Sequence, residues 1–145
     1  MHVQESIEIA APSERIWPLL VEPDNVLRWY GTLRTFRYGE GPRGVDGHIY
    51  VEEQGPGGLM KLDFEITEWA EDRALALHMA SGTGVAGYDQ RWTLEPLAAA
   101  TRFTFTEDVE LPFGALGRII GRFAQRNSTR HAKEMLAKLK ALAEA

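Results

Sequence analysis

The hydrophobic pattern of this chain changes its period near residue 112. Between residues 33 and 110, apolar side chains alternate with polar or small ones, as in Met60, Leu62 and Phe64, and glycine-rich turns separate the runs. A period of two indicates strands with one buried face. Over residues 114–144 the period becomes that of a helix. The chain is therefore predicted to pack a sheet of closely connected strands against one long C-terminal helix.

The strand region is preceded by a further strand and two short helices. Residues 2–10 alternate in the same way and predict the opening strand. Pro12 stands at a position typical of a first helical turn, Pro23 ends that helix, and Asp24 with Asn25 is predicted to cap a second one. Six more strands are predicted at residues 33–38, 46–53, 59–69, 73–80, 87–95 and 101–110.

The connections between these strands are too short for parallel crossovers, so neighbouring strands are predicted to be antiparallel. The fold class is α+β, with a seven-stranded curved sheet around the C-terminal helix. No linker, repeat or low-complexity tract interrupts the 145 residues, which are expected to form a single domain, 1–145.

Composition and charge narrow the function classes. The net charge of −5 argues against nucleic-acid binding, and no apolar run approaches the length of a membrane span, so no integral membrane insertion is expected. The chain has no cysteine, which excludes disulfides and thiolate chemistry. The N-terminus lacks the pattern of a secretory signal, so a cytoplasmic location is expected. A monomer and a homodimer both remain open.

Several segments carry a family resemblance. They are residues 9–17 (IAAPSERIW), 22–29 (EPDNVLRW), 68–75 and 92–103. Together with the order of elements they resemble the START-like or polyketide cyclase/dehydrase superfamily (SRPBCC), whose fold is called a helix-grip. The resemblance covers essentially the whole chain. Ala98, Ala99 and Ala100 stand where the family usually has a Gly-Thr turn.

The resemblance implies a function as well as a fold. Members of this superfamily carry lipids or hormones, cyclise or aromatise polyketides, bind quinones or act as co-chaperones. The leading expectation is that a small hydrophobic or aromatic ligand, lipid-like or polyketide-like, binds in a cavity between the sheet and the C-terminal helix, with no cofactor. A cyclase/dehydrase-type enzyme using acid-base residues in that cavity is one alternative. A protein-interaction module that uses a basic helix face is another.

Polar residues on the predicted inner face of the sheet are candidates for the site. Tyr88 and Gln90 share a strand face with Trp92, and Glu107 shares one with Phe103 and Phe105. They are predicted to point inward, although these positions could also lie in water at the open end of the sheet. If Glu107 is buried, its pKa is raised and it can act as a general acid or base.

The long helix contributes a second group of candidates. Asn127 and His131 are four residues apart, between Phe123 and Met135 in the apolar stripe, so both are expected to face the sheet. His131 there could donate to a ligand carbonyl or shuttle a proton, or could be a hydrogen-bonded structural histidine. The catalytic candidates are Glu107, His131 and Tyr88, and the ligand-binding candidates are Tyr30, Phe64, Leu77, Tyr88, Gln90, Trp92, Phe103, Phe105, Phe123, Asn127 and His131.

Other motifs are interpreted structurally. The four histidines, including His48 and His78 on predicted outer faces, have no metal-ligand spacing, and no metal is expected. The G-x-G-x-x-G strings at 39–44 and 82–87 precede strands and are interpreted as turns. The G-x-x-x-G pair at 117 and 121 indicates close packing or a kink.

The long helix also has a row of arginines at every fourth residue, Arg118, Arg122, Arg126 and Arg130. This row is either a solvated face or a contact for an acidic partner or a membrane surface.

Overall fold

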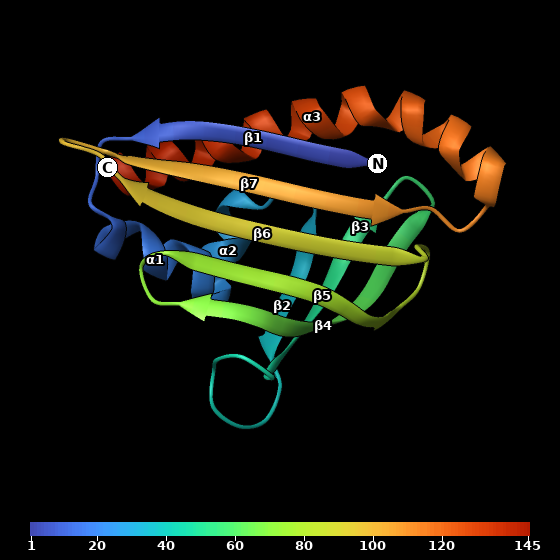
Figure 1. Ribbon diagram of the computed structural model, residues 1–145, viewed down its shortest axis with the longest axis horizontal. Helices are drawn as coiled ribbons and strands as arrows, with labels where there is room; N and C mark the ends of the chain where they lie inside the picture. Colours follow the sequence, from blue (N-terminus) through green and yellow to red (C-terminus); the bar gives the residue numbers. More distant parts are fainter.

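The computed structural model describes residues 1–145 and has the predicted architecture. One seven-stranded antiparallel sheet curls around a long C-terminal helix (Figure 1). The elements are β1 (His2–Ile9), α1 (Ser13–Val21), α2 (Pro23–Trp29), β2 (Leu33–Tyr38), β3 (His48–Gly55), β4 (Gly58–Ala70), β5 (Ala74–Gly82), β6 (Gly87–Pro96), β7 (Thr101–Glu110) and α3 (Gly114–Glu144).

The sheet order is β1-β7-β6-β5-β4-β3-β2. Strands β2 to β7 form a meander in which each strand pairs with the next along the chain. The first strand then pairs with the last, in a continuous register from His2 opposite Asp108 to Ile9 opposite Thr101. Register shifts in the β2–β3 and β4–β5 pairs bend the sheet, since an extra residue in one strand increases the local twist. The concave face of the bent sheet receives α3.

The predicted strand bounds agree with the structure to within two residues. The largest differences arise at turns, where β3 begins at His48 because Asp46 adopts a left-handed conformation with φ of 73°. Both glycine-rich strings lie in the turns that precede β3 and β6, as predicted.

The start of the second short helix differs from the prediction. The helix α2 begins at Pro23, with Glu22 at its N-cap, and no side chain caps it. Asp24 and Asn25 therefore lie in its first turn instead of capping it. Proline is favoured here because the first helical residues have no intrahelical acceptor for their N–H groups. The side chain of Asn25 instead donates to the Pro18 carbonyl oxygen at 3.2 Å and ties α2 to α1.

The packed face of α3 is the main correction to the sequence prediction. The predicted stripe passed through large apolar residues and included Phe123, Asn127 and His131, yet all three side chains are exposed. The buried positions of α3 are Gly117, Gly121, Ala132, Met135, Leu136, Leu139 and Ala143. In the first half of α3 the buried positions are glycines, because the helix there approaches Leu111 closely.

The two glycines of α3 illustrate this close approach. A Cβ atom at Gly117 would lie 3.2 Å from Leu111 Cβ, and one at Gly121 would lie 3.5 Å from Leu111 Cδ1. The G-x-x-x-G pair thus serves close packing, one of its two predicted roles. Along its length α3 packs mainly on β1, with smaller contacts to α1 and α2. No helix of the structure is long and apolar enough to cross a membrane.

Candidate functional site

A chain of buried hydrogen bonds crosses the inner face of the sheet. The Trp92 indole N–H donates to Gln90 Oε1 at 2.9 Å. Gln90 Nε2 donates to the hydroxyls of Tyr30 at 2.7 Å and Tyr88 at 2.9 Å. The Tyr88 hydroxyl donates to Glu53 Oε1 at 2.8 Å. None of these five residues is more than 8% exposed, so the hydrogen bonds lie inside the protein. With Glu107, they are called the polar cluster below.

Four elements bring the polar cluster together. Tyr88, Gln90 and Trp92 alternate on β6 and therefore point to the same face. Glu107 lies opposite Gln90 in the β6–β7 register, which places it on that face too. The other two members are Glu53 near the end of β3 and Tyr30 at the C-terminal end of α2.

Glu53 is a central member that the sequence analysis did not identify. Its Oε1 accepts from Tyr88, and its Oε2 accepts from the Thr32 hydroxyl at 2.8 Å. Burial raises the pKa of Glu53 because it penalises the charged form, although the hydrogen bonds from Thr32, Tyr88 and Tyr30 act in the opposite direction. Its alternation with Ile49 and Val51 on β3 was the signal that could have found it.

Glu107 is the titratable group with the clearest chemical consequence. Burial is the main cause that raises the pKa of Glu107 to about 8, and the nearby charge of Glu53 acts in the same direction. At neutral pH the side chain is therefore mostly protonated. A protonated carboxyl is a hydrogen-bond donor as well as an acceptor. Glu107 can thus donate to an oxygen atom or serve as a general acid.

The two tyrosines of the polar cluster remain neutral hydroxyls. Burial is the main cause that raises the pKa of Tyr30 and of Tyr88 well above the usual value. The Tyr30 oxygen accepts from Gln90 and lies 3.4 Å from the Tyr88 oxygen. This distance is beyond the usual range of an O–H···O hydrogen bond. The acceptor that remains for the Tyr30 hydroxyl is the Glu53 carboxyl, whose pKa a hydrogen bond from Tyr30 lowers.

The polar cluster lies toward the end of the sheet from which α3 starts. Tyr88 and Gln90 are near the start of β6, and Glu107 is near the end of β7. The helix α3 follows β7 after a short turn, so its first half extends over this end of the sheet (Figure 1). Aromatic rings border the cluster, with Phe64 5.3 Å from Tyr88 and Phe105 6.1 Å from Tyr30 between ring centroids.

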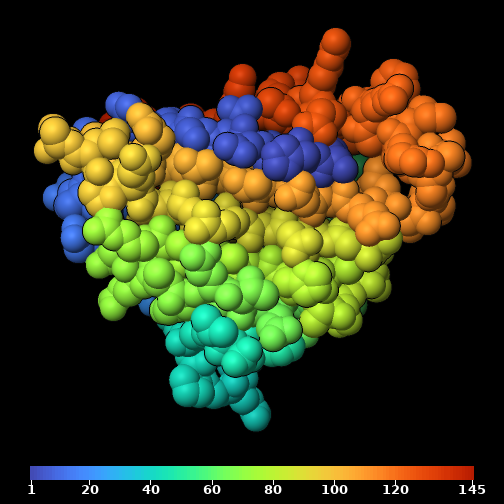
Figure 2. Space-filling model, viewed as in Figure 1, coloured from blue at the N-terminus to red at the C-terminus, as the bar shows by residue number.

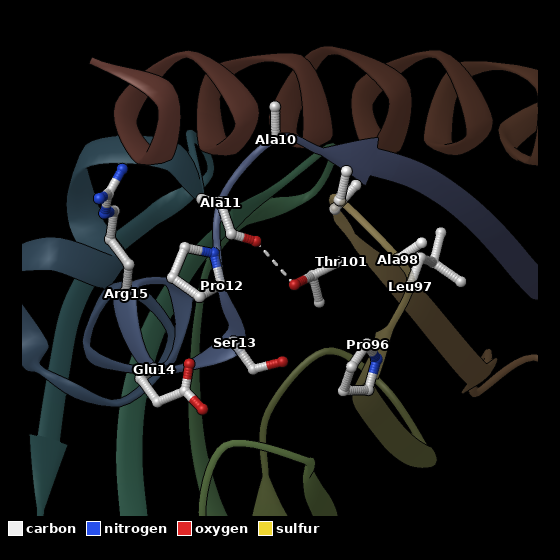
Figure 3. A pocket seen from close by; sticks show the side chains of 12 residues that line it. Ala10, Ala11, Pro12, Ser13, Glu14, Arg15, Pro96, Leu97, Ala98 and Thr101 are labelled. Carbon is white, nitrogen blue, oxygen red and sulfur yellow. Dashed lines mark hydrogen bonds between the residues drawn. The ribbon is translucent and has the colours of Figure 1, made fainter.

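Two pockets lie away from the space between the sheet and α3. One of about 440 Å³ is lined by residues 10–15 and 96–101, where the Thr101 hydroxyl donates to the Ala11 carbonyl at 2.7 Å (Figure 3). The buried Ser13 hydroxyl has no hydrogen-bond partner. A second pocket of about 190 Å³ includes Arg91 and Asp108. Neither is lined by α3, so neither is the predicted cavity between sheet and helix. No group of three side chains could hold a metal ion.

Comparison with known families shows which protein family the chain belongs to. A family model described as polyketide cyclase / dehydrase and lipid transport matches residues 1–144. The chain belongs to this family. The resemblance predicted from residues 9–17, 22–29, 68–75 and 92–103 is thereby confirmed. No curated protein sequence matches the chain significantly.

Solved structures show the same fold at low sequence identity. A protein from Thermus thermophilus is 17% identical, with a TM-score of 0.81, and the match covers 99% of this chain and 97% of that one. The Zhui aromatase/cyclase from Streptomyces is 15% identical, with a TM-score of 0.81 and coverage of 99% and 93%. A START superfamily protein from Mycobacterium smegmatis is 18% identical, with a TM-score of 0.76 and coverage of 97% and 98%.

Within this polyketide cyclase/dehydrase and lipid transport family fold, the predicted site residues separate into two groups. The β-strand candidates are brought together: Tyr88 and Gln90 point inward as predicted, and Phe64, Leu77, Trp92, Phe103 and Phe105 join Tyr30 in the core. The helix candidates are not. The expectation that Asn127 and His131 face the sheet is wrong, because the packed face of α3 runs through Gly121 and Ala132. Asn127 accepts from Arg130, and His131 Nδ1 lies 3.8 Å from Glu134.

Proposed function

We propose that the protein binds a small, mostly apolar ligand through a neutral oxygen-bearing group held by the polar cluster. The observation that carries this proposal is the placement of two carboxyl groups, the buried Glu53 and the half-buried Glu107, among hydroxyl and amide groups on the inner face of the sheet. Burying such groups costs free energy that apolar side chains at the same positions would not. Titratable groups with shifted pKa values concentrate at functional sites.

The donors of the polar cluster favour one ligand chemistry. The protonated Glu107 carboxyl and the Tyr30 hydroxyl are both able to donate a proton to an acceptor oxygen. The polar cluster has no basic side chain that could pair with an anion, so burying a charged ligand group there would cost free energy. A ketone, ester, quinone or neutral hydroxyl group therefore fits better than a carboxylate or phosphate. The neighbouring rings of Phe64, Trp92 and Phe105 favour an aromatic or otherwise flat apolar body.

A pair of shape-matched compounds tests this recognition. 2-Acetonaphthone and 2-ethylnaphthalene share an aromatic body, but only the first has a carbonyl oxygen. Isothermal titration is expected to show about 10- to 100-fold tighter binding of the ketone, because a buried hydrogen bond to a ligand discriminates on this scale. Tyr30→Phe removes one donor and is expected to reduce the preference several-fold.

Tyr38→Phe is the matched control. The Tyr38 hydroxyl donates to the Val21 carbonyl at 2.6 Å, outside the polar cluster, so this variant also loses one internal hydrogen bond. It should keep the preference for the ketone. Equal affinities for the two naphthalenes, or an equal loss in both variants, would contradict the proposed recognition.

An enzyme of the cyclase/dehydrase kind is the second candidate function. The specific observation in its favour is the pKa of about 8 at Glu107, which suits a general acid or base near neutral pH. Tyr88 could assist, since its hydroxyl belongs to the same hydrogen-bonded chain. His131 is exposed and separate from this chain, so the acid-base chemistry would rest on the sheet alone. A carrier releases its ligand unchanged, whereas an enzyme releases a different compound.

A further inference from the structure

The first half of α3 exposes large apolar side chains. The chain has seven exposed large hydrophobic residues, and five of them lie in this short stretch. Figure 2 shows the segment, in orange, projecting beyond the body of the protein. The five are Phe113 (65% exposed), Leu116 (58%), Ile119 (55%), Ile120 (45%) and Phe123 (81%). An exposed apolar cluster of this size indicates a surface that contacts a membrane or another protein.

A row of arginines runs beside these apolar side chains. Arg118, Arg122, Arg126 and Arg130 are all exposed, and none forms an ion pair. No acidic residue occurs from 111 to 133. The remainder of the chain is strongly acidic, because the net charge is −5 although residues 113–145 hold seven basic and two acidic residues. Positive charge is therefore concentrated where the apolar side chains are exposed.

Helical spacing places the two groups next to each other on the outer side of α3. Ile119 and Phe123 are one turn apart and share a face with Leu116. The arginines, at intervals of four, form a neighbouring row. Gly117 and Gly121 pack against Leu111 on the other side of the helix. The outer side thus combines an apolar stripe with a basic flank, the arrangement of helices that lie in the interface of a bilayer.

We propose that the first half of α3, residues 113–130, docks on an anionic lipid surface. The apolar side chains enter the boundary between headgroups and acyl chains, and the arginine side chains extend to the lipid phosphates. Charge complementarity favours an anionic lipid surface over a second copy of the chain. A twofold contact between two copies through this face would bring two rows of arginines together, and their like charges would repel each other. The proposal goes beyond ligand recognition by the polar cluster and stands on different residues.

Vesicle flotation tests the docking directly. Binding is expected to vesicles that contain phosphatidylglycerol and to be much weaker with phosphatidylcholine alone. Because each basic residue near an anionic membrane contributes about a fivefold factor, Arg118→Gln/Arg122→Gln/Arg126→Gln should lower the partition coefficient on the order of 100-fold. Raising the salt from about 0.1 M to about 1 M should weaken wild-type binding as well. The matched control is Arg15→Gln/Lys61→Gln/Arg73→Gln, which removes three exposed charges elsewhere and should bind like wild type.

The apolar contribution has its own readout. Phe123→Ser should weaken vesicle binding, whereas Val45→Ser, at another exposed apolar residue, should not. In Phe123→Trp, brominated lipids should quench the introduced indole but leave wild-type fluorescence unchanged. Three of the four native tryptophans are buried, and the fourth, Trp69, packs against Trp17 away from α3. Tyr30→Phe should dock normally, which separates docking from ligand binding.

Three results would overturn the docking proposal. The first is an absence of binding to anionic vesicles. The second is binding that the arginine and Phe123 variants leave unchanged. The third is a concentration-dependent dimer, seen by analytical ultracentrifugation and abolished by Phe123→Ser, because the apolar face would then be covered by a second copy.

Discussion

Glu107→Gln is expected to raise the free energy of unfolding at about pH 9 by on the order of 3 to 5 kcal/mol and to change it little at about pH 4. The pKa of Glu107 rises from 4.5 in the exposed state to about 8 in the folded protein. Between these values the unfolded chain releases the proton while the folded chain retains it. The wild type therefore loses stability as the pH rises through this window, and glutamine, which does not titrate, removes that loss.

Urea unfolding at a series of pH values measures this effect. The quantity of interest is the difference in free energy of unfolding between Glu107→Gln and wild type, since other titrating groups contribute to both. Glu110→Gln is the matched control because Glu110 is on the same strand but exposed. A difference that does not change with pH would show that Glu107 is not held protonated in the folded protein.

Trp29→Ala is expected to lower the free energy of unfolding by about 3 to 5 kcal/mol. Trp29 is fully buried, and its ring lies 5.3 Å from that of Trp92 and 6.0 Å from that of Phe103. Its indole N–H donates to the Leu19 carbonyl at 2.7 Å. Alanine leaves a cavity between α2 and the sheet and an unsatisfied carbonyl group, two costs that add.

Denaturant unfolding with a graded set of variants checks this effect. Trp29→Phe keeps an aromatic ring and should cost less than Trp29→Ala. Phe113→Ala truncates a ring that is 65% exposed and should change stability by no more than about 0.5 kcal/mol. Because Tyr30 follows Trp29 directly, Trp29→Ala should also disturb the polar cluster. A loss below about 1 kcal/mol for Trp29→Ala would mean that α2 does not depend on this contact.

The sheet could be predicted from the sequence because alternation determines which face of each strand is buried. Alternation alone predicts that Tyr88, Gln90 and Glu107 lie on the inner face, and in the structure all three do. The same argument applies to Glu53, whose position alternates with Ile49 and Val51. What alternation cannot give is which inward polar groups meet, since their contacts depend on how the sheet bends and where α2 ends.

The orientation of α3 could not be predicted in the same way. Hydrophobic periodicity assigns the buried face to the largest apolar residues, which are Leu116, Ile120 and Phe123 in the first half of the helix. The structure buries Gly117 and Gly121 instead, because small residues allow the helix to approach Leu111. In the second half of the helix the large apolar residues Met135 and Leu139 are also the buried ones, and there the prediction is right.

Native mass spectrometry of the protein purified from its own host tests the central claim, that the polar cluster binds a small apolar ligand through a neutral oxygen group. We expect a co-purifying compound with an apolar body and a carbonyl or hydroxyl oxygen. It should be retained by Tyr38→Phe and by Glu107→Gln, whose amide still donates, and depleted several-fold in Tyr30→Phe. Release of an altered compound after incubation would assign the protein to the enzymes. A protein that is empty at high expression, or a compound that all variants retain equally, would contradict the claim.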